Sequence, residues 1–113
     1  MNNGVPFDMA RFDVFRNSGK GQAAIPFLLD VQSNHIEALG SRIVIPLRRL
    51  DRFPKVLLPL DLTPVFEIDG IACMLDTPQL AAIPKATLKT VVVSLAHEQA
   101  TIVASLDRVF GGF

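Results

Sequence analysis

The sequence predicts a single α+β domain that is mainly β, with an antiparallel meander of about five strands and one C-terminal helix. Three observations predict this fold. Apolar residues alternate with others through 25–31 and 42–47, the period of a strand with one buried face. The turn pair Asp69-Gly70 separates two β-type runs. From Leu95 onward the apolar residues follow helical spacing instead.

The composition limits the chain to one globular domain. Its 113 residues carry 11 Lys plus Arg against 11 Asp plus Glu, and 50% of them are hydrophobic. A chain of this length buries one core but rarely two, and this hydrophobic fraction excludes disorder. Zero net charge argues against a general nucleic-acid binder, because such proteins need a basic excess.

The cysteine content and the N-terminus indicate a cytoplasmic protein. Cys73 is the single cysteine, so it forms no intramolecular disulfide and no zinc site by itself. Residues 1–8 lack the basic and apolar regions of a secretory signal. They also lack periodicity, so we interpret 1–8 as an extension, from a tag or an earlier start codon, and 9–113 as the domain.

Prolines interrupt the strands predicted in the N-terminal half. Alternation begins at 12–14 and returns at 25–31, where Pro26 suggests an edge position or a bulge. The run 42–47 is again strand-like, and Pro46 is expected to end its regular pairing. The meander therefore begins with two or three short strands.

The pair Asp69-Gly70 predicts a two-residue hairpin of type I′. This turn sets the register of the two strands, because facing residues then share one side of the hairpin. The residues expected on its buried face are Phe66, Ile68, Ile71 and Cys73. Cys73 is thus interpreted as a core residue.

The last third of the chain changes from strand to helix. Two prolines keep 76–85 from forming a long helix, and 90–93 is a β-branched strand. Ser94 is a suitable N-cap for the helix, and Gly111 with Gly112 ends it. The expected buried stripe is made of Leu95, Ile102, Val103, Leu106, Val109 and Phe110.

The chain contains no complete catalytic or metal-binding motif. His97-Glu98 begins the H-E-x-x-H pattern, but the second histidine is missing. His35 lies in a polar loop, where a solvated histidine is more common than a general base. A nucleophilic cysteine needs a neighbouring base, which the hairpin register does not supply. We therefore predict no catalytic residue, no metal and no cofactor, and hence a protein that is not an enzyme.

The charges are separated along the chain. The segment 42–55 has a balance of +4 from five bases and Asp51, whereas 61–76 holds four acids and no base. In one interpretation the two segments lie side by side and neutralise each other. In the other, the arginines of 42–55 bind an acidic partner, because the arginine fork matches a carboxylate.

The C-terminus is apolar and ends on an aromatic residue. The last four residues are Phe110, Gly111, Gly112 and Phe113, whereas most soluble chains end in polar, frayed residues. This end either folds back on the domain as an anchor or serves as a short hydrophobic recognition element.

Several motifs, in order and spacing, resemble the CcdB family of plasmid and chromosomal toxins. They are 27-FLLDVQS-33, 42-RIVIPL-47, 76-DTPQLAAIP-84 and 95-LAHEQATIVASLDRVFGG-112. The resemblance covers about residues 9–113. It implies a homodimeric toxin of a type II toxin–antitoxin module with an SH3-like barrel, which in plasmids serves plasmid maintenance. Family members are not enzymes: they bind the DNA gyrase A subunit and trap gyrase on cleaved DNA.

The resemblance also implies the contact residues. The gyrase contact of the family is made by the last three residues, commonly Trp-Gly-Ile, which correspond here to Gly111, Gly112 and Phe113. Gly111 thus stands where a large aromatic residue is usual, so a weakened or retargeted poison is an alternative. The implied antitoxin folds a disordered C-terminal segment onto the toxin, and we expect Arg48, Arg49 and Arg52 to receive its acidic residues.

Two further functions remain open from the sequence. Related small barrels include endoribonuclease toxins, which would make this chain an enzyme, with His35 and Arg42 as candidate catalytic groups. An inactive chromosomal homologue is the third possibility, and the departure at Gly111 is the reason to consider it.

Overall fold

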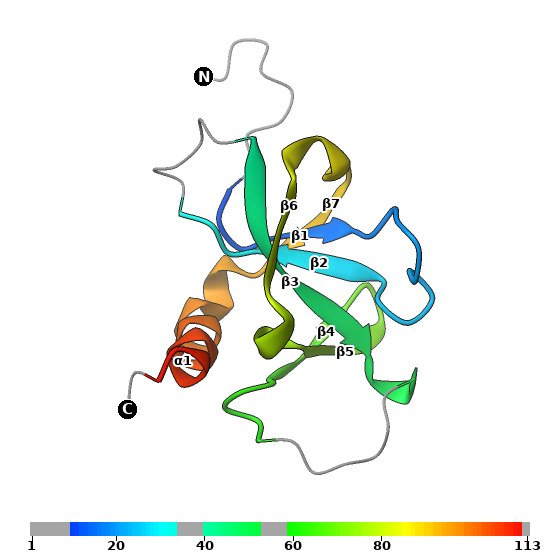
Figure 1. Cartoon of the computed structure of the whole chain (residues 1–113). Helices are drawn as coiled ribbons and strands as arrows, with labels where there is room; N and C mark the ends of the chain where they lie inside the picture. Colours follow the sequence, from blue (N-terminus) through cyan, green and yellow to red (C-terminus); the bar gives the residue numbers. More distant parts are fainter. Residues whose placement is uncertain (1–9, 34–39, 53–58, 112–113) are drawn as a thin grey trace.

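The computed structural model describes residues 10–33, 40–52 and 59–111, and it confirms the mainly β fold with one C-terminal helix (Figure 1). Its strands are β1 (Asp13–Arg16), β2 (Phe27–Asp30), β3 (Ser41–Arg49), β4 (Val65–Ile68), β5 (Ile71–Leu75), β6 (Ala81–Pro84) and β7 (Val91–Ser94). The helix is α1 (Gln99–Val109), and short 3-10 turns lie at Leu50–Arg52, Thr77–Gln79, Lys85–Thr87 and Ala96–Glu98. The described part thus has seven strands where the sequence predicted about five.

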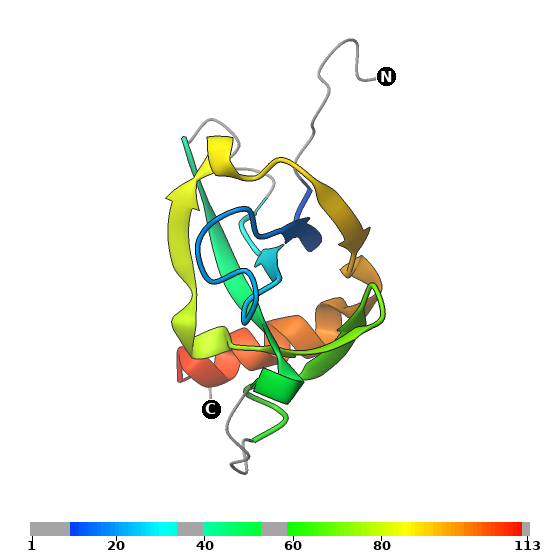
Figure 2. The same cartoon turned by 90° about the vertical axis from the view of Figure 1, so that its right-hand side faces the viewer.

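The seven strands form one antiparallel sheet. Its order is β4-β5-β3-β2-β1-β7, and β6 pairs with β3 off this path. The sheet curls into a partly open barrel, and α1 lies against one side of it (Figures 1 and 2). Within the three described ranges, no helix has the length and apolar character needed to span a membrane.

Strand β3 continues through Pro46, so the prediction that this proline ends regular pairing is wrong. Along one edge β3 pairs with β2, and along the other it pairs with β6 through 41–44 and with β5 through 47–49. The Pro46 carbonyl accepts a hydrogen bond from the Asp76 N–H at 2.9 Å on this second edge. Because the N–H and C=O of a strand residue face the same edge, the missing N–H lies where β3 changes partner and interrupts neither ladder.

Pro26 also differs from expectation, whereas 76–85 forms no long helix, as its two prolines predicted. Pro26 precedes β2 instead of lying within a strand or bulge, and the irregularity in this region is between Val14 and Phe15, where β1 pairs with β7. The segment 76–85 contains β6, whose last residue is Pro84. A terminal position on an outer strand tolerates proline because no ladder bond is lost there.

The β4–β5 hairpin has the predicted turn and register. Asp69 and Gly70 have φ angles of +53° and +79°, and a type I′ turn requires positive φ at both positions. Phe66 pairs with Cys73, and Ile68 pairs with Ile71. Cys73 is fully buried, which confirms its interpretation as a core residue.

The main core lies between the curled sheet and α1. Its residues include Val14, Phe27, Leu29, Ile45, Leu47, Ile68, Cys73, Leu75, Leu95 and Ile102. A smaller cluster of Phe15, Val44 and Leu88 lies apart from it, and Leu28 and Ile83 pack against this cluster. Helix α1 is also tied to the 3-10 turn Thr77–Gln79, which follows β5, by a buried hydrogen bond from Thr77 Oγ1 to Ser105 Oγ at 3.2 Å.

The prediction that Ser94 caps the helix is wrong, because α1 begins at Gln99 and its N-cap position is Glu98, without a side-chain cap. Ser94 Oγ does accept a hydrogen bond from the Ala96 N–H at 3.1 Å, at the start of the 3-10 turn Ala96–Glu98, whose N-cap position is Leu95. Such 3-10 turns are frequent at helix ends.

Candidate functional site

Helix α1 is followed by a turn at Phe110 and Gly111, both of which are exposed. The Phe110 N–H donates to the Leu106 carbonyl at 3.0 Å, the last bond of the helical ladder. Gly111 then adopts φ +72°, the left-handed conformation in which helices commonly stop. The predicted glycine stop is therefore confirmed for Gly111, while Gly112 and Phe113 lie outside the described residues.

Phe110 is 71% exposed, so its predicted place in the buried stripe is wrong. Ile102 is fully buried, and Val103 and Leu106 pack against the main core. The helical spacing identified the correct face of α1. It carried no information on where the sheet beneath that face ends, and Phe110 lies beyond this point.

A second exposed apolar residue lies on a loop that is linked to the same helix end. Arg108 Nε lies 2.8 Å from Asp61 Oδ2, and the neighbouring Leu60 is 69% exposed. We call the surface formed by Leu60, Asp61, Arg108, Phe110 and Gly111 the helix-end surface. No pattern in the sequence predicts the Arg108–Asp61 pair, because the two residues come from distant parts of the chain.

The predicted arginine cluster is partly neutralised within the chain itself. Arg48 Nε lies 2.6 Å from Asp76 Oδ2, and this pair links the basic segment to the acidic one. Arg49 donates from Nε and Nη2 to the two oxygens of Asp51 at 3.1 and 2.9 Å. The hydrogen bond from Arg49 lowers the pKa of Asp51. Arg52 is exposed, so the structure does not bring the three arginines together as unpaired charges.

Arg42 is not available to a substrate, which removes it as a candidate catalytic group. Its side chain is 1% exposed and pairs with Asp30, which is fully buried. Arg42 Nε donates to Asp30 Oδ2 at 2.9 Å, while Nη2 lies 2.7 Å from the same oxygen outside hydrogen-bond geometry. Asp30 also accepts the Gln32 N–H at 3.0 Å. His35, its proposed partner, lies outside the described residues.

The described residues offer little for metal or nucleophilic chemistry. They contain no group of three His, Cys, Asp or Glu side chains that could hold a metal ion. Burial raises the pKa of the Cys73 thiol to about 11, so Cys73 is a thiol and not a nucleophilic thiolate at neutral pH. His97 is exposed, and its Nε2 lies 4.0 Å from the Glu98 carboxylate.

Sequence comparison decides the family. A family model described as CcdB protein matches residues 11–112, nearly the whole chain. This chain belongs to the CcdB family. It is therefore a toxin of the toxin–antitoxin type, as the motifs around β2, β3 and α1 predicted. No curated protein is significantly similar to this CcdB-family chain in sequence.

Two solved structures are similar to this CcdB-family chain in fold. An endoribonuclease from a mycobacterial species, solved in complex with its cognate antitoxin, has a TM-score of 0.71 and 13% identity, covering 92% of this chain and 96% of that chain. The Mycobacterium tuberculosis toxin MazF-mt6 has a TM-score of 0.64 and 11% identity, covering 88% and 96%. At these identities the likeness shows a shared fold alone, and it confirms the predicted small barrel.

The same comparison bears on the predicted absence of enzyme activity. One of the two similar structures is described as an endoribonuclease, so the fold is compatible with catalysis. The expectation that this chain is not an enzyme therefore stays a prediction, and the endoribonuclease alternative stays open.

Proposed function

We propose that this CcdB-family toxin binds the DNA gyrase A subunit and traps the gyrase–DNA cleavage complex, without chemistry of its own. It acts in the cytoplasm as a homodimer and is neutralised by a cognate antitoxin. The observation that carries the proposal is the exposed Phe110 at the end of α1, directly before the three residues that the family uses for its gyrase contact.

The helix-end surface has the composition of a binding contact. Phe110 and Leu60 are the two most exposed large apolar side chains in the described part of the chain, at 71% and 69%. Aromatic residues of this size dominate interface energetics and are common among hot spots. Phe110 therefore supplies an aromatic side chain next to Gly111, where the family usually has tryptophan.

The homodimer is supported by further apolar residues at the surface. Val91 and Val93 of β7 are 47% and 39% exposed, and among the described strands β7 pairs only with β1. A second copy of the chain would cover such residues. Sedimentation of the purified protein over a range of concentrations tests this directly, and a monomer at all concentrations contradicts it.

Expression in cells with two gyrase variants tests the target. We expect killing, with accumulated DNA breaks, in cells with ordinary gyrase and survival in cells whose A subunit is altered at the toxin-binding surface. Deletion of 111–113 should abolish killing and leave the dimer intact in sedimentation. Killing in both strains contradicts the gyrase proposal, and killing in neither favours an inactive homologue.

The second candidate is an endoribonuclease, supported by the fold shared with a mycobacterial endoribonuclease. Incubation of purified protein with RNA in the absence of gyrase tests it, with the 111–113 deletion as a matched sample. Cleavage that survives this deletion would favour the endoribonuclease, whereas intact RNA favours the gyrase proposal.

A further inference from the structure

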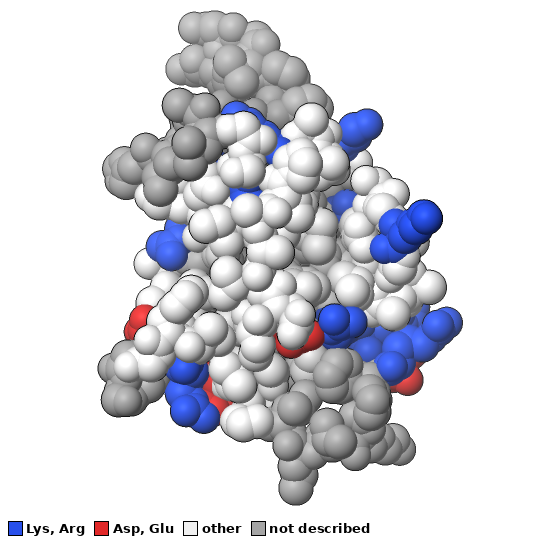
Figure 3. Space-filling model, viewed as in Figure 1, with Lys and Arg blue, Asp and Glu red and all other residues white. Residues whose placement is uncertain are grey.

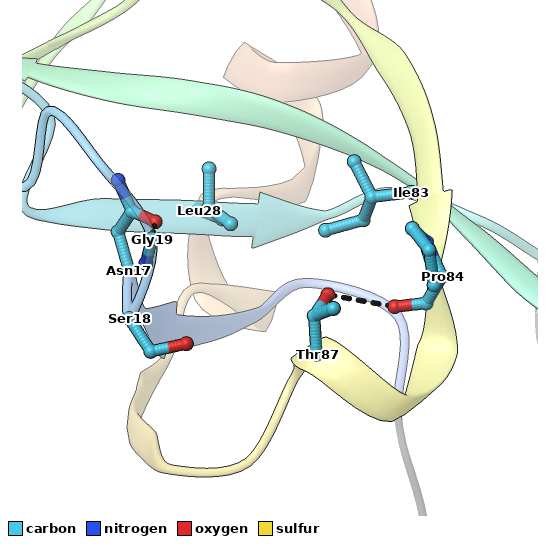
Figure 4. Close-up of a pocket in the computed structure, with 7 residues that line it drawn as sticks. All are labelled: Asn17, Ser18, Gly19, Leu28, Ile83, Pro84 and Thr87. Carbon is cyan, nitrogen blue, oxygen red and sulfur yellow. Dashed lines mark hydrogen bonds between the residues drawn. The ribbon is translucent and has the colours of Figure 1, made fainter.

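A shallow apolar hollow lies beside the smaller core cluster, apart from the helix-end surface. Its volume is about 520 Å³. The β1–β2 loop forms one wall, β2 supplies the floor, and β6 with the following 3-10 turn forms the other wall (Figure 4). The lining residues are Asn17, Ser18, Gly19, Leu28, Ile83, Pro84 and Thr87.

Most polar groups of this lining are already hydrogen-bonded within the chain. Asn17 Nδ2 donates to the Ile25 carbonyl at 2.8 Å, and Asn17 Oδ1 accepts the Gly19 N–H at 3.0 Å. Thr87 Oγ1 donates to the Pro84 carbonyl at 2.7 Å, as Figure 4 shows. What remains for a ligand is the apolar surface of residues such as Leu28 and Ile83. This surface fits an aliphatic side chain.

The lining does not have the groups that read a nucleotide base. Recognition of single-stranded bases uses stacking on aromatic rings and free polar groups at the base edges. The lining contains no aromatic residue, and the side chains of Asn17 and Thr87 are already engaged. The hollow is therefore better suited to a peptide than to RNA.

The segments around the hollow are basic and carry no acid. Segments 16–28 and 77–97 contain Arg16, Lys20, Lys85 and Lys89 and no Asp or Glu. Lys20 follows the lining residue Gly19 directly, Lys89 lies two positions after Thr87, and both lysines are exposed. In Figure 3 the described upper part of the visible face carries blue side chains toward its edges and no red ones, while its centre, where Figure 1 places β6, is mainly white.

The lysines beside the hollow differ from the arginine cluster, in which two of the three side chains already pair with carboxylates of the same chain. Arg48 and Arg49 already have carboxylate partners in Asp76 and Asp51. An incoming acidic segment must compete with these partners at Arg48 and Arg49. Of the bases around the hollow, Arg16 lies 3.7 Å from Asp69, so the argument depends on the exposed Lys20 and Lys89. Electrostatic complementarity therefore favours the hollow as the place where an acidic peptide docks.

We propose that this hollow binds an apolar side chain of an extended acidic peptide, with Lys20 and Lys89 pairing with the carboxylates on either side of that side chain. This inference rests on the proposed function in one respect, because the antitoxin is the natural source of such a peptide. It moves the expected antitoxin contact from Arg48, Arg49 and Arg52 to the β1–β2 loop and β6.

Titration of the isotopically labelled full chain with defined peptides, followed by amide NMR, tests the proposal. The probe is a hexapeptide of Glu and Asp around one central Leu, and the matched peptide has Ser in place of Leu. We expect the acidic Leu peptide to shift the amides of Ser18, Gly19 and Thr87 at low salt. The Ser peptide should bind about 10-fold more weakly, because burying a leucine side chain contributes most of the short-range affinity.

Three variants locate the contact. Lys20→Glu combined with Lys89→Glu should weaken the Leu peptide about 5- to 20-fold at low salt and less at high salt. Ser18→Trp should block the hollow and weaken binding of the Leu peptide. Arg52→Glu combined with Arg49→Glu is the matched control, an equal double charge reversal at the arginine cluster, and it should leave the affinity unchanged within about twofold. An unchanged spectrum elsewhere shows that each variant is folded.

Several results overturn the proposal. They are peptide-induced shifts at 48–52 instead of the hollow, equal binding of the Leu and Ser peptides, no binding at millimolar peptide, and tighter binding of oligouridylate than of the peptide at the same amides. Failure of this proposal can be told apart from failure of the gyrase proposal. In cells without antitoxin, the variant with Lys20→Glu and Lys89→Glu should kill as the unmodified chain does. If the unmodified chain does not kill, the peptide titration still tests whether the hollow binds an acidic peptide.

Discussion

Arg42 and Asp30 form an ion pair in which the two side chains are 1% and 0% exposed. The pair connects β3 to the end of β2, and Gln32 continues the network by accepting the Ile43 N–H through Oε1 at 3.1 Å. A buried pair of this kind is not a strong source of stability by itself, because desolvation offsets the attraction. Breaking it, however, leaves a charge that nothing compensates.

Removal of one partner should therefore destabilise the fold strongly. We expect Asp30→Ala to lower the free energy of unfolding by about 3–5 kcal/mol, because the Arg42 guanidinium then stays buried without its carboxylate. Urea denaturation followed by circular dichroism measures the change. The double variant Asp30→Leu with Arg42→Met should recover most of the loss. If the free energy of unfolding of Asp30→Ala lies within about 1 kcal/mol of that of the unmodified chain, the pair does not have this role.

The partly buried carboxylate of Asp13 in β1 should make the free energy of unfolding depend on pH in the acid range. Burial raises the pKa of Asp13 above 3.8, and the Ala10 N–H only partly offsets it. A raised pKa means that the folded state binds protons more readily than the unfolded state. The contribution of Asp13 to the free energy of unfolding is thus present below pH 3.8, and it is lost as the pH rises through the pKa of Asp13 in the folded state.

Asp13→Asn removes this titration. We expect the difference in unfolding free energy, parent minus variant, to fall as the pH rises from about 3 to about 6, the range that spans ordinary and raised carboxyl pKa values. Denaturant unfolding at several pH values measures it. Glu67→Gln, at an exposed strand position, is the control for removal of a carboxylate charge from the sheet. A difference that rises with pH contradicts the burial argument.

The exposure of Phe110 separates binding from folding at this position. At 71% exposure the ring contributes little to the core, so Phe110→Ala should change the unfolding free energy by less than about 0.5 kcal/mol. If the ring is a gyrase anchor, the same change should weaken gyrase binding about 30- to 1000-fold. Surface plasmon resonance against the gyrase A subunit measures it. Val65→Ala, at another exposed apolar residue, is the matched control.

The left-handed conformation of Gly111 limits what position 111 tolerates. A Cβ there would meet no atom within 4 Å, but φ is +72°, so the cost of a side chain is conformational and not steric crowding by neighbours. We expect Gly111→Ala to lower the unfolding free energy by about 1 kcal/mol and Gly111→Asn by less, because asparagine adopts this region more readily. Thermal unfolding measures both, and equal values for the two would argue against the conformational explanation.

Gly111→Trp restores the aromatic residue that the family usually has at this position, so it tests whether gyrase is the target. Gly111→Trp has open space around its Cβ, so its cost in folding is the same left-handed backbone strain that Gly111→Ala carries. A gain in gyrase affinity would show that the helix-end surface faces gyrase. No gain, together with a folded dimer, would show that this surface has another role.

Local chemistry in the sequence determined the hairpin and the end of the helix. Asp69-Gly70 sets its own turn type, which in turn places Phe66 opposite Cys73, and Gly111 acts within a few residues of its own position. These features depend on short-range backbone preferences, so they were predictable without knowledge of distant contacts.

Only the tertiary structure decided which segments meet. It makes β6 a strand by placing it beside β3, lets Pro46 stand where β3 changes partner, and buries Arg42 against Asp30. It also pairs Arg48 with Asp76 and leaves Phe110 beyond the edge of the core. Periodicity identifies the apolar face of an element but not its neighbour, and the partner of a charge or a strand edge is set by long-range packing.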